Sequence, residues 1–236
     1  MKKRNDGAAG FSLLELLVGT VLFTIVTGAV FSLLMTAQLR YRGESNVSQV
    51  FQQANVAIDQ ITRDVHSTGY PPANSFATNV AQNNPQWVAL PFSWSPGYAN
   101  VPPVQCFVKA SCGAVPGDYD LILETDTGNG VQWIRYSLVG TTLMRGVASK
   151  VPFVDPVAQT NGSLLPYLEN VVNGPNAIFS YCYGTGCGDT TTPHQPSNIR
   201  EVNVCLMVQP PQPDPQTRQL RTVTLTGQAM RFNPSQ

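Results

Sequence analysis

The cysteines are the side chains of this sequence best suited to covalent chemistry. All five lie beyond residue 100, namely Cys106, Cys112, Cys182, Cys187 and Cys205. In an oxidising compartment we expect one disulfide between Cys182 and Cys187, because the four residues between them can turn back. We expect a second between Cys106 and Cys112, which leaves Cys205 free. An odd number of cysteines does not by itself fix the connectivity.

Other groups could bind a metal ion. Cys182 and Cys187 could hold zinc together with His194, but the C-x4-C spacing and the missing fourth ligand favour a disulfide loop. Glu124 and Asp126 lie on one face of a predicted strand, where calcium could bind, although such acidic pairs are common on exposed edges. The sequence contains no nucleophile elbow, zincin helix or phosphate-binding glycine loop. We therefore predict no catalytic residues, no cofactor and no resident metal.

Glu15 is the ionisable residue of an apolar run that extends from Phe11 to about Leu39. Such a run is long enough to cross a bilayer, which needs about 20 apolar residues. A carboxylate inside a membrane is costly and usually functional, because it needs a cation as partner. The alternative is that Glu15 is an interfacial carboxylate that reaches toward the lipid headgroups.

The residues before the apolar run determine its orientation. Lys2, Lys3 and Arg4 predict a cytoplasmic N-terminus and place everything after Leu39 outside the cytoplasm. The small residues 7–10 precede the run, whereas the cleavage site of a secretory signal follows a shorter apolar core. Cleavage after Ala37 would be the secretory alternative, but Met35 stands where a small residue is needed.

The segment Gly10-Phe11-Ser12-Leu13-Leu14-Glu15 resembles the processing site of type IV prepilins. The resemblance implies that a prepilin peptidase cleaves between Gly10 and Phe11 and that the new amino group of Phe11 is methylated. It also implies an assembly role for Glu15. The implied partners are other major and minor pilins or pseudopilins, the inner-membrane assembly platform and membrane lipid.

The spacing of apolar residues predicts that the membrane helix continues outward as an amphipathic helix. Its apolar stripe comprises Val47, Val50, Phe51, Ala54, Ile58, Ile61 and Val65. Gly69 and the two prolines that follow end the helix, and Gly43 marks a possible hinge. We expect a leader at 1–10, a transmembrane helix at 11–39, an amphipathic helix at 40–69, a Pro/Asn-rich loop region at 70–118 and a β domain at 119–236.

Alternating apolar and polar residues predict several strands in the last part of the chain. The clearest alternation places Val202, Val204, Leu206 and Val208 on one face. The proline-rich segment 210–215 predicts a hairpin loop between the last two strands. The expected fold class is α+β and pilin-like, with a long N-terminal helix packed on an antiparallel sheet.

Short phrases further along the chain resemble the PilW-like minor pilins and the PulJ-like minor pseudopilins of type II secretion. They are Arg63-Asp64-Val65, Trp133-Ile134-Arg135-Tyr136, Leu143-Met144-Arg145 and Leu168-Glu169-Asn170-Val171. The resemblance implies a structural or initiation subunit of a type IV pilus or secretion filament, first in the inner membrane with a periplasmic domain. The alternative is a single-pass, membrane-anchored periplasmic binding or catalytic domain with no filament role. Fourteen basic and fourteen acidic residues leave no net charge, which argues against a nucleic-acid partner.

Overall fold

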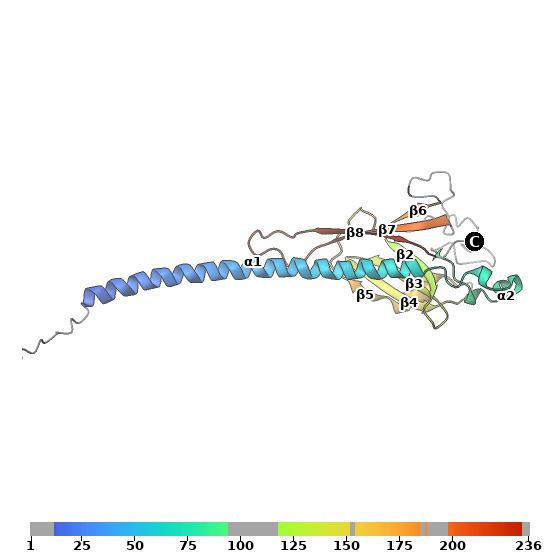
Figure 1. Cartoon of the computed structure of the whole chain (residues 1–236), viewed down its shortest axis with the longest axis horizontal. Helices are drawn as coiled ribbons and strands as arrows, with labels where there is room; N and C mark the ends of the chain where they lie inside the picture. Colours follow the sequence, from blue (N-terminus) through green and yellow to red (C-terminus); the bar gives the residue numbers. More distant parts are fainter. Residues whose placement is uncertain (1–11, 94–117, 152–153, 185–186, 188–197, 233–236) are drawn as a thin grey trace, which may run out of the picture. The chain divides into compact units, whose positions relative to one another are not determined.

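The computed structural model describes residues 12–93, 118–151, 154–184, 187 and 198–232. The chain divides into two compact units. The first comprises Met1–Ser45 with Pro213–Gln219, and the second comprises Asn46–Gln212 with Leu220–Gln236. Helix α1, Leu13–Ser67, contributes residues to both (Figure 1).

Helix α1 is long because nothing in its sequence interrupts it. No proline occurs from Phe11 to Ser67, and Ser12 accepts a hydrogen bond from the backbone N–H of Leu14 at the start of the helix. The helix continues through Gly43. Just past its last residue, Gly69 adopts a φ of 77°, a left-handed conformation that favours glycine and cannot continue a helix.

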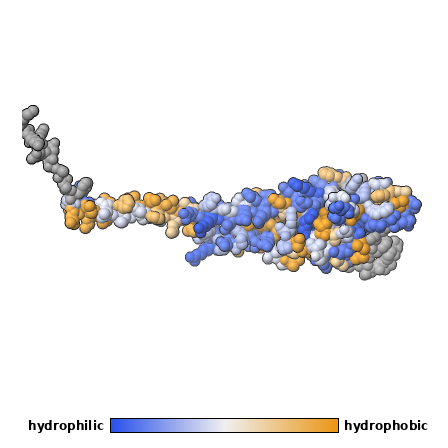
Figure 2. Space-filling view, turned by 90° about the horizontal axis from the view of Figure 1, so that it is seen from below, coloured by the Kyte–Doolittle hydropathy of each residue, from blue (hydrophilic) through white to orange (hydrophobic). Residues whose placement is uncertain are grey.

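The part of α1 in the first unit is apolar and exposed. Every residue from Ser12 to Arg42 except Thr27 is exposed, and Figure 2 shows mostly hydrophobic residues beside the grey N-terminal segment. Among the described residues, α1 is the helix long and apolar enough to cross a membrane. An apolar surface of this size is stable only when lipid or another protein covers it.

The second unit contains two antiparallel sheets. The five-stranded sheet has the order β1 (Phe92–Ser93), β2 (Asp120–Asp126), β3 (Val131–Val139), β4 (Thr142–Ser149) and β5 (Leu165–Leu168). The three-stranded sheet has the order β6 (Phe179–Tyr183), β7 (Ile199–Val208) and β8 (Val223–Met230). β7 and β8 form the predicted hairpin, with Val208 opposite Val223.

Short helical segments lie between α1 and β1 and between β4 and β5. They are α2 (Thr78–Asn83) and α3 (Pro156–Thr160), together with the 3-10 turns η1 (Ala73–Ser75), η2 (Pro85–Trp87) and η3 (Asn161–Ser163). Helix α3 begins where Asp155 caps the backbone N–H of Val157 and a proline occupies the first turn.

The second half of α1 and both sheets share one apolar core. The helix contributes Val50, Ala54, Ala57, Ile58, Ile61 and Val65, all buried. Trp133, Tyr136, Phe92 and Phe179 are the largest of the fully buried side chains that the sheets contribute. The α+β fold, with a long apolar N-terminal helix followed by antiparallel sheets, is confirmed. One residue of the predicted apolar stripe is wrong. Phe51 is 46% exposed, and Ala57 lies in the core instead.

Candidate processing and assembly site

The predicted processing site lies at the edge of what the structure describes. Gly10 and Phe11 lie outside the described residues, and α1 begins two residues beyond Phe11. Cleavage between Gly10 and Phe11 therefore stays a prediction.

Glu15 occupies the first turn of α1 and is exposed. A negative charge is favourable there, because the unpaired N–H groups of the first turn give this helix end a partial positive charge. The neighbouring side chains are apolar and exposed, Leu14 at 70% and Leu16 at 63%. The next charged residue along the sequence is Arg40, about 38 Å away along the helix. Glu15 is therefore an isolated acid on an apolar helix, suited to accept a cation from another molecule.

Three hydroxyl groups of the apolar segment, those of Thr20, Thr24 and Thr36, bond to the helix itself. Thr20 donates to the carbonyl oxygen of Leu17 at 2.9 Å, and Thr24 donates to that of Val21 at 2.8 Å. These bonds remove the need for water, which is what residence in a lipid core requires. These threonines are consequently compatible with a membrane.

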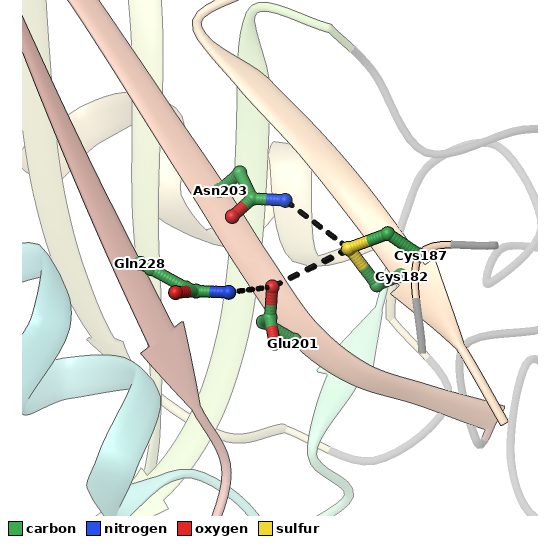
Figure 3. Close-up of a disulfide and its surroundings, with 5 residues drawn as sticks. All are labelled: Cys182, Cys187, Glu201, Asn203 and Gln228. Atoms are coloured by element: carbon green, nitrogen blue, oxygen red, sulfur yellow. Dashed lines mark hydrogen bonds between the residues drawn. A yellow bond between two sulfur atoms is a disulfide. The ribbon is translucent and has the colours of Figure 1, made fainter. Parts of the chain in front are cut away.

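The structure joins Cys182 of β6 to Cys187 in a disulfide (Figure 3). The amide nitrogen of Asn203 lies 3.2 Å from the sulfur of Cys182, and the carboxylate of Glu201 lies 3.4 Å from the sulfur of Cys187. Gln228 of β8 donates to the same carboxylate oxygen. The carboxylate of Glu201 is thus held by the sheet beside the sulfur atoms.

The other cysteine predictions have different outcomes. Cys106 and Cys112 lie outside the described residues. Cys205 is a free, partly exposed thiol. The zinc alternative loses its two thiolates while the disulfide is present, and its third ligand, His194, lies outside the described residues.

The idea of a calcium site at Glu124 and Asp126 is wrong for Glu124. Its side chain is fully buried and pairs with the ammonium group of Lys150 at 2.6 Å. The same carboxylate accepts hydrogen bonds from the backbone N–H of Leu90 and the hydroxyl of Ser93. These contacts hold β1 and the residue Leu90 before it against β2, so this acid is structural.

A second network lies between α1 and the five-stranded sheet, and sequence reasoning did not predict it. One carboxylate oxygen of Asp64 accepts hydrogen bonds from the hydroxyl of Tyr136 at 2.5 Å and from the Nη2 atom of Arg145 at 2.9 Å. Gln60 donates to the other oxygen. Burial raises the pKa of Tyr136 far above its usual range, and the negative charge of Asp64 adds to this shift. Asp64, Tyr136 and Arg145 come from three of the short phrases quoted above, so those phrases converge on one contact.

An open groove of about 620 Å³ lies between α1 and β5 with the residues that follow it. The helix lines it with Asn46, Gln49 and Gln53, and the opposite wall includes Tyr167 and Glu169. The lining is rich in amide groups, which can donate and accept hydrogen bonds. The groove therefore offers hydrogen-bonding groups beside apolar side chains.

Comparison with known proteins identifies one family model. Residues 6–31 match the prokaryotic N-terminal methylation motif, which spans Gly10, Phe11 and Glu15. No match is found among curated proteins, and none is found among solved structures. The motif supports a type IV pilin-like protein, anchored in the membrane by α1 and processed by prepilin peptidase.

Proposed function

We propose that this protein is a minor pilin or pseudopilin that helps to initiate or cap a type IV pilus or a type II secretion filament. The observation that carries the proposal is the methylation motif at the start of a helix whose first half is apolar and exposed, with Glu15 in its first turn. A folded domain of antiparallel sheets follows, as a filament subunit requires. The absence of proline from the apolar segment, where major pilins often carry one, favours a minor role.

In this proposal the mature chain begins at a methylated Phe11. Lys2, Lys3 and Arg4 hold the leader in the cytoplasm, and the domain after the membrane lies in the periplasm. The disulfide between Cys182 and Cys187 supports that location, because disulfides persist in oxidising compartments. The partners are prepilin peptidase, the assembly platform of the inner membrane, and other pilins or pseudopilins.

The mass of the mature N-terminal peptide tests the processing step. We expect a peptide that begins with methylated Phe11, and we expect Gly10→Val to leave an uncut precursor in cells with active prepilin peptidase. Ser12→Ala is the matched control, since it changes a neighbouring residue outside the cleaved bond and should mature normally. Intact Met1 in the wild type, or cleavage after Ala37, would favour the membrane-anchored domain with no filament role.

Stoichiometry tests the minor role. Purified filaments should contain this chain at a small fraction of the major subunit, and its deletion should reduce the number of filaments rather than their length. A chain that is the most abundant filament subunit would contradict the minor assignment while leaving the processing step intact.

A further inference from the structure

A loop from the far end of the sequence contacts α1 near the end of its apolar segment. Gly43 is buried, and a Cβ atom placed on it would lie 3.4 Å from Cδ of Pro215 and 3.6 Å from a carboxylate oxygen of Asp214. The segment Pro213–Gln219, which belongs to the connection between β7 and β8, falls in the same compact unit as the first half of α1. The tip of this connection therefore packs against the helix backbone at Gly43.

The tip is held in one conformation by its own hydrogen bonds. The carboxylate of Asp214 accepts from the backbone N–H groups of Gln216 at 2.8 Å and Thr217 at 3.1 Å. The backbone N–H of Arg218 donates to the carbonyl of Asp214 at 2.7 Å, and Arg218 itself has a φ of 56°. The carboxylate of Asp214 thus accepts hydrogen bonds within the turn, whereas the side chain of Arg218 is exposed.

The position of Gly43 along the helix places this tip at the level of the lipid headgroups. Glu15 and Arg40 lie 25 positions apart with no other charge between them, or about 38 Å of helix. That length exceeds the hydrocarbon core, about 30 Å, and is slightly less than the full bilayer, about 40 to 45 Å. Arg40 therefore reaches the headgroup layer when α1 spans the membrane, and Gly43 follows about 4.5 Å later.

The groups at this level are suited to phosphate. Arg40 and Arg42 are exposed and flank Tyr41, whose ring is 75% exposed. Arginine binds phosphate oxygens in a two-pronged geometry, and tyrosine is enriched at membrane interfaces. Glu44 is the acid next to them on the helix. Arg40, Arg42 and Arg218 together leave an excess of one positive charge over Glu44 and Asp214.

We propose that the tip of the β7–β8 connection, Pro213–Gln219, is a membrane-surface contact in which Arg218, together with Arg40 and Arg42, binds phospholipid headgroups. The proposal rests on the membrane anchoring of α1 and goes beyond it, because it adds a lipid contact made by a loop about 170 residues away in sequence. The tip has no large apolar side chain, so it lies on the surface rather than inserting. Assembly into a filament must release this contact when the subunit leaves the bilayer.

Photocrosslinking of the full chain in vesicles tests the proposal. A photoreactive amino acid replaces Gln216 in the tip, Thr226 on the exposed face of β8, or Leu34 in the apolar segment. The vesicles contain phosphatidylcholine and phosphatidylglycerol, and lipid attachment is read by mass. We expect lipid adducts from Gln216 and Leu34 but only background from Thr226. Arg218→Gln should reduce the Gln216 adduct about fivefold, Arg218→Lys should retain most of it, and high salt should weaken it.

The Leu34 probe distinguishes the membrane anchoring of α1 from the headgroup contact of the tip. Adducts at Leu34, with equal yields at Gln216 and Thr226, would overturn the headgroup contact and leave the anchoring intact. Failure of the Leu34 probe would overturn the anchoring and the headgroup contact together. A Gln216 adduct whose yield is the same in wild type and Arg218→Gln would overturn the role of the arginine.

Discussion

At the scale of single residues, the acids of this protein fall into two classes that the sequence does not separate. Glu124 and Asp64 are buried and fully engaged by Lys150, Tyr136 and Arg145. Removing one partner of such a group leaves a buried charge uncompensated, which is strongly destabilising. Glu15 is the opposite case, exposed on an apolar surface and available for a partner. Burial and partners, rather than residue type, therefore separate structural acids from the candidate functional one.

Tyr136 provides a test of the buried network through pH. Burial and Asp64 raise its pKa above the usual value near 10. A group whose pKa is higher in the folded state stabilises that state below the unfolded pKa and loses this contribution as pH rises toward the folded pKa. We therefore expect the free energy of unfolding to fall above about pH 10, by up to about 1.4 kcal/mol per pH unit for this group.

Chemical denaturation of the full chain in detergent measures the effect. Tyr136→Phe should be less stable at neutral pH by about 1.5 to 3 kcal/mol, because it loses a hydrogen bond to a charged group, and its alkaline decline should be shallower. Tyr181 is partly buried, and burial raises its pKa, so it should supply part of the remaining decline. Tyr70→Phe, at an exposed position, is the control. Equal alkaline slopes in wild type and Tyr136→Phe would contradict the assignment.

At the scale of elements, the sequence predicts those that have a periodic pattern. The second half of α1 shows helical spacing and strands β7 and β8 show alternation, each over seven or more residues. No sequence pattern predicts strand β5, because it has only four residues, contains Pro166 and is largely exposed. Helix α3 carries a start signal, an Asp followed by Pro, that could have revealed it. The burial of Glu124 could not be predicted, since Lys150 is 26 residues away.

The packing of β8 on α1 gives a prediction at the same scale. A Cβ atom on Gly227 would lie 2.4 Å from Cγ2 of Ile58, a β-branched side chain with little rotamer freedom in a helix. Gly227→Ala must therefore push the strand away from the helix, and we expect it to destabilise the protein by about 1 to 3 kcal/mol.

Two further variants make this prediction specific. Gly162→Ala is the matched control, since a Cβ there meets nothing within 4 Å, and it should change stability by less than about 0.5 kcal/mol. In an Ile58→Ala background the added methyl group of Gly227→Ala has room, so its cost should be much smaller. If Gly227→Ala costs the same in both backgrounds, the close contact with Ile58 is not the reason for the glycine.

At the scale of the whole molecule, the processing motif could be predicted from the sequence, whereas the contacts that organise the domain could not. The processing motif is local, since residues 6–31 carry it without any help from the fold. The contacts that organise the domain join distant positions, such as Asp64 with Arg145, 81 residues apart. Local chemistry was therefore predictable from the sequence, whereas the position of the tip Pro213–Gln219 against Gly43 emerged only from the structure.

Glu15 connects the motif to assembly, and its substitution is the test that bears on the filament role. A carboxylate in hydrocarbon costs about 2.5 to 3.5 kcal/mol on insertion scales, and the apolar segment itself offers no cation. Cleavage after Gly10 would create one, the amino group of Phe11, which carries a positive charge at neutral pH. A neighbouring subunit displaced along the filament axis can bring its Phe11 to this Glu15. Because desolvation offsets much of the attraction, such a pair sets the register of subunits more than it stabilises them.

We expect Glu15→Val to insert into the membrane at least as well as the wild type and to keep a folded domain, because no described contact of the second unit involves Glu15. Recruitment should fail instead, seen as loss of crosslinks to partner pilins and as fewer fibres in cells that lack the wild-type copy. Thr20→Val is the control, since the Thr20 hydroxyl bonds only to its own helix among the described contacts. Crosslinks and fibre numbers at wild-type levels in Glu15→Val cells would remove the assembly role of Glu15 and leave a plain membrane anchor as the better account.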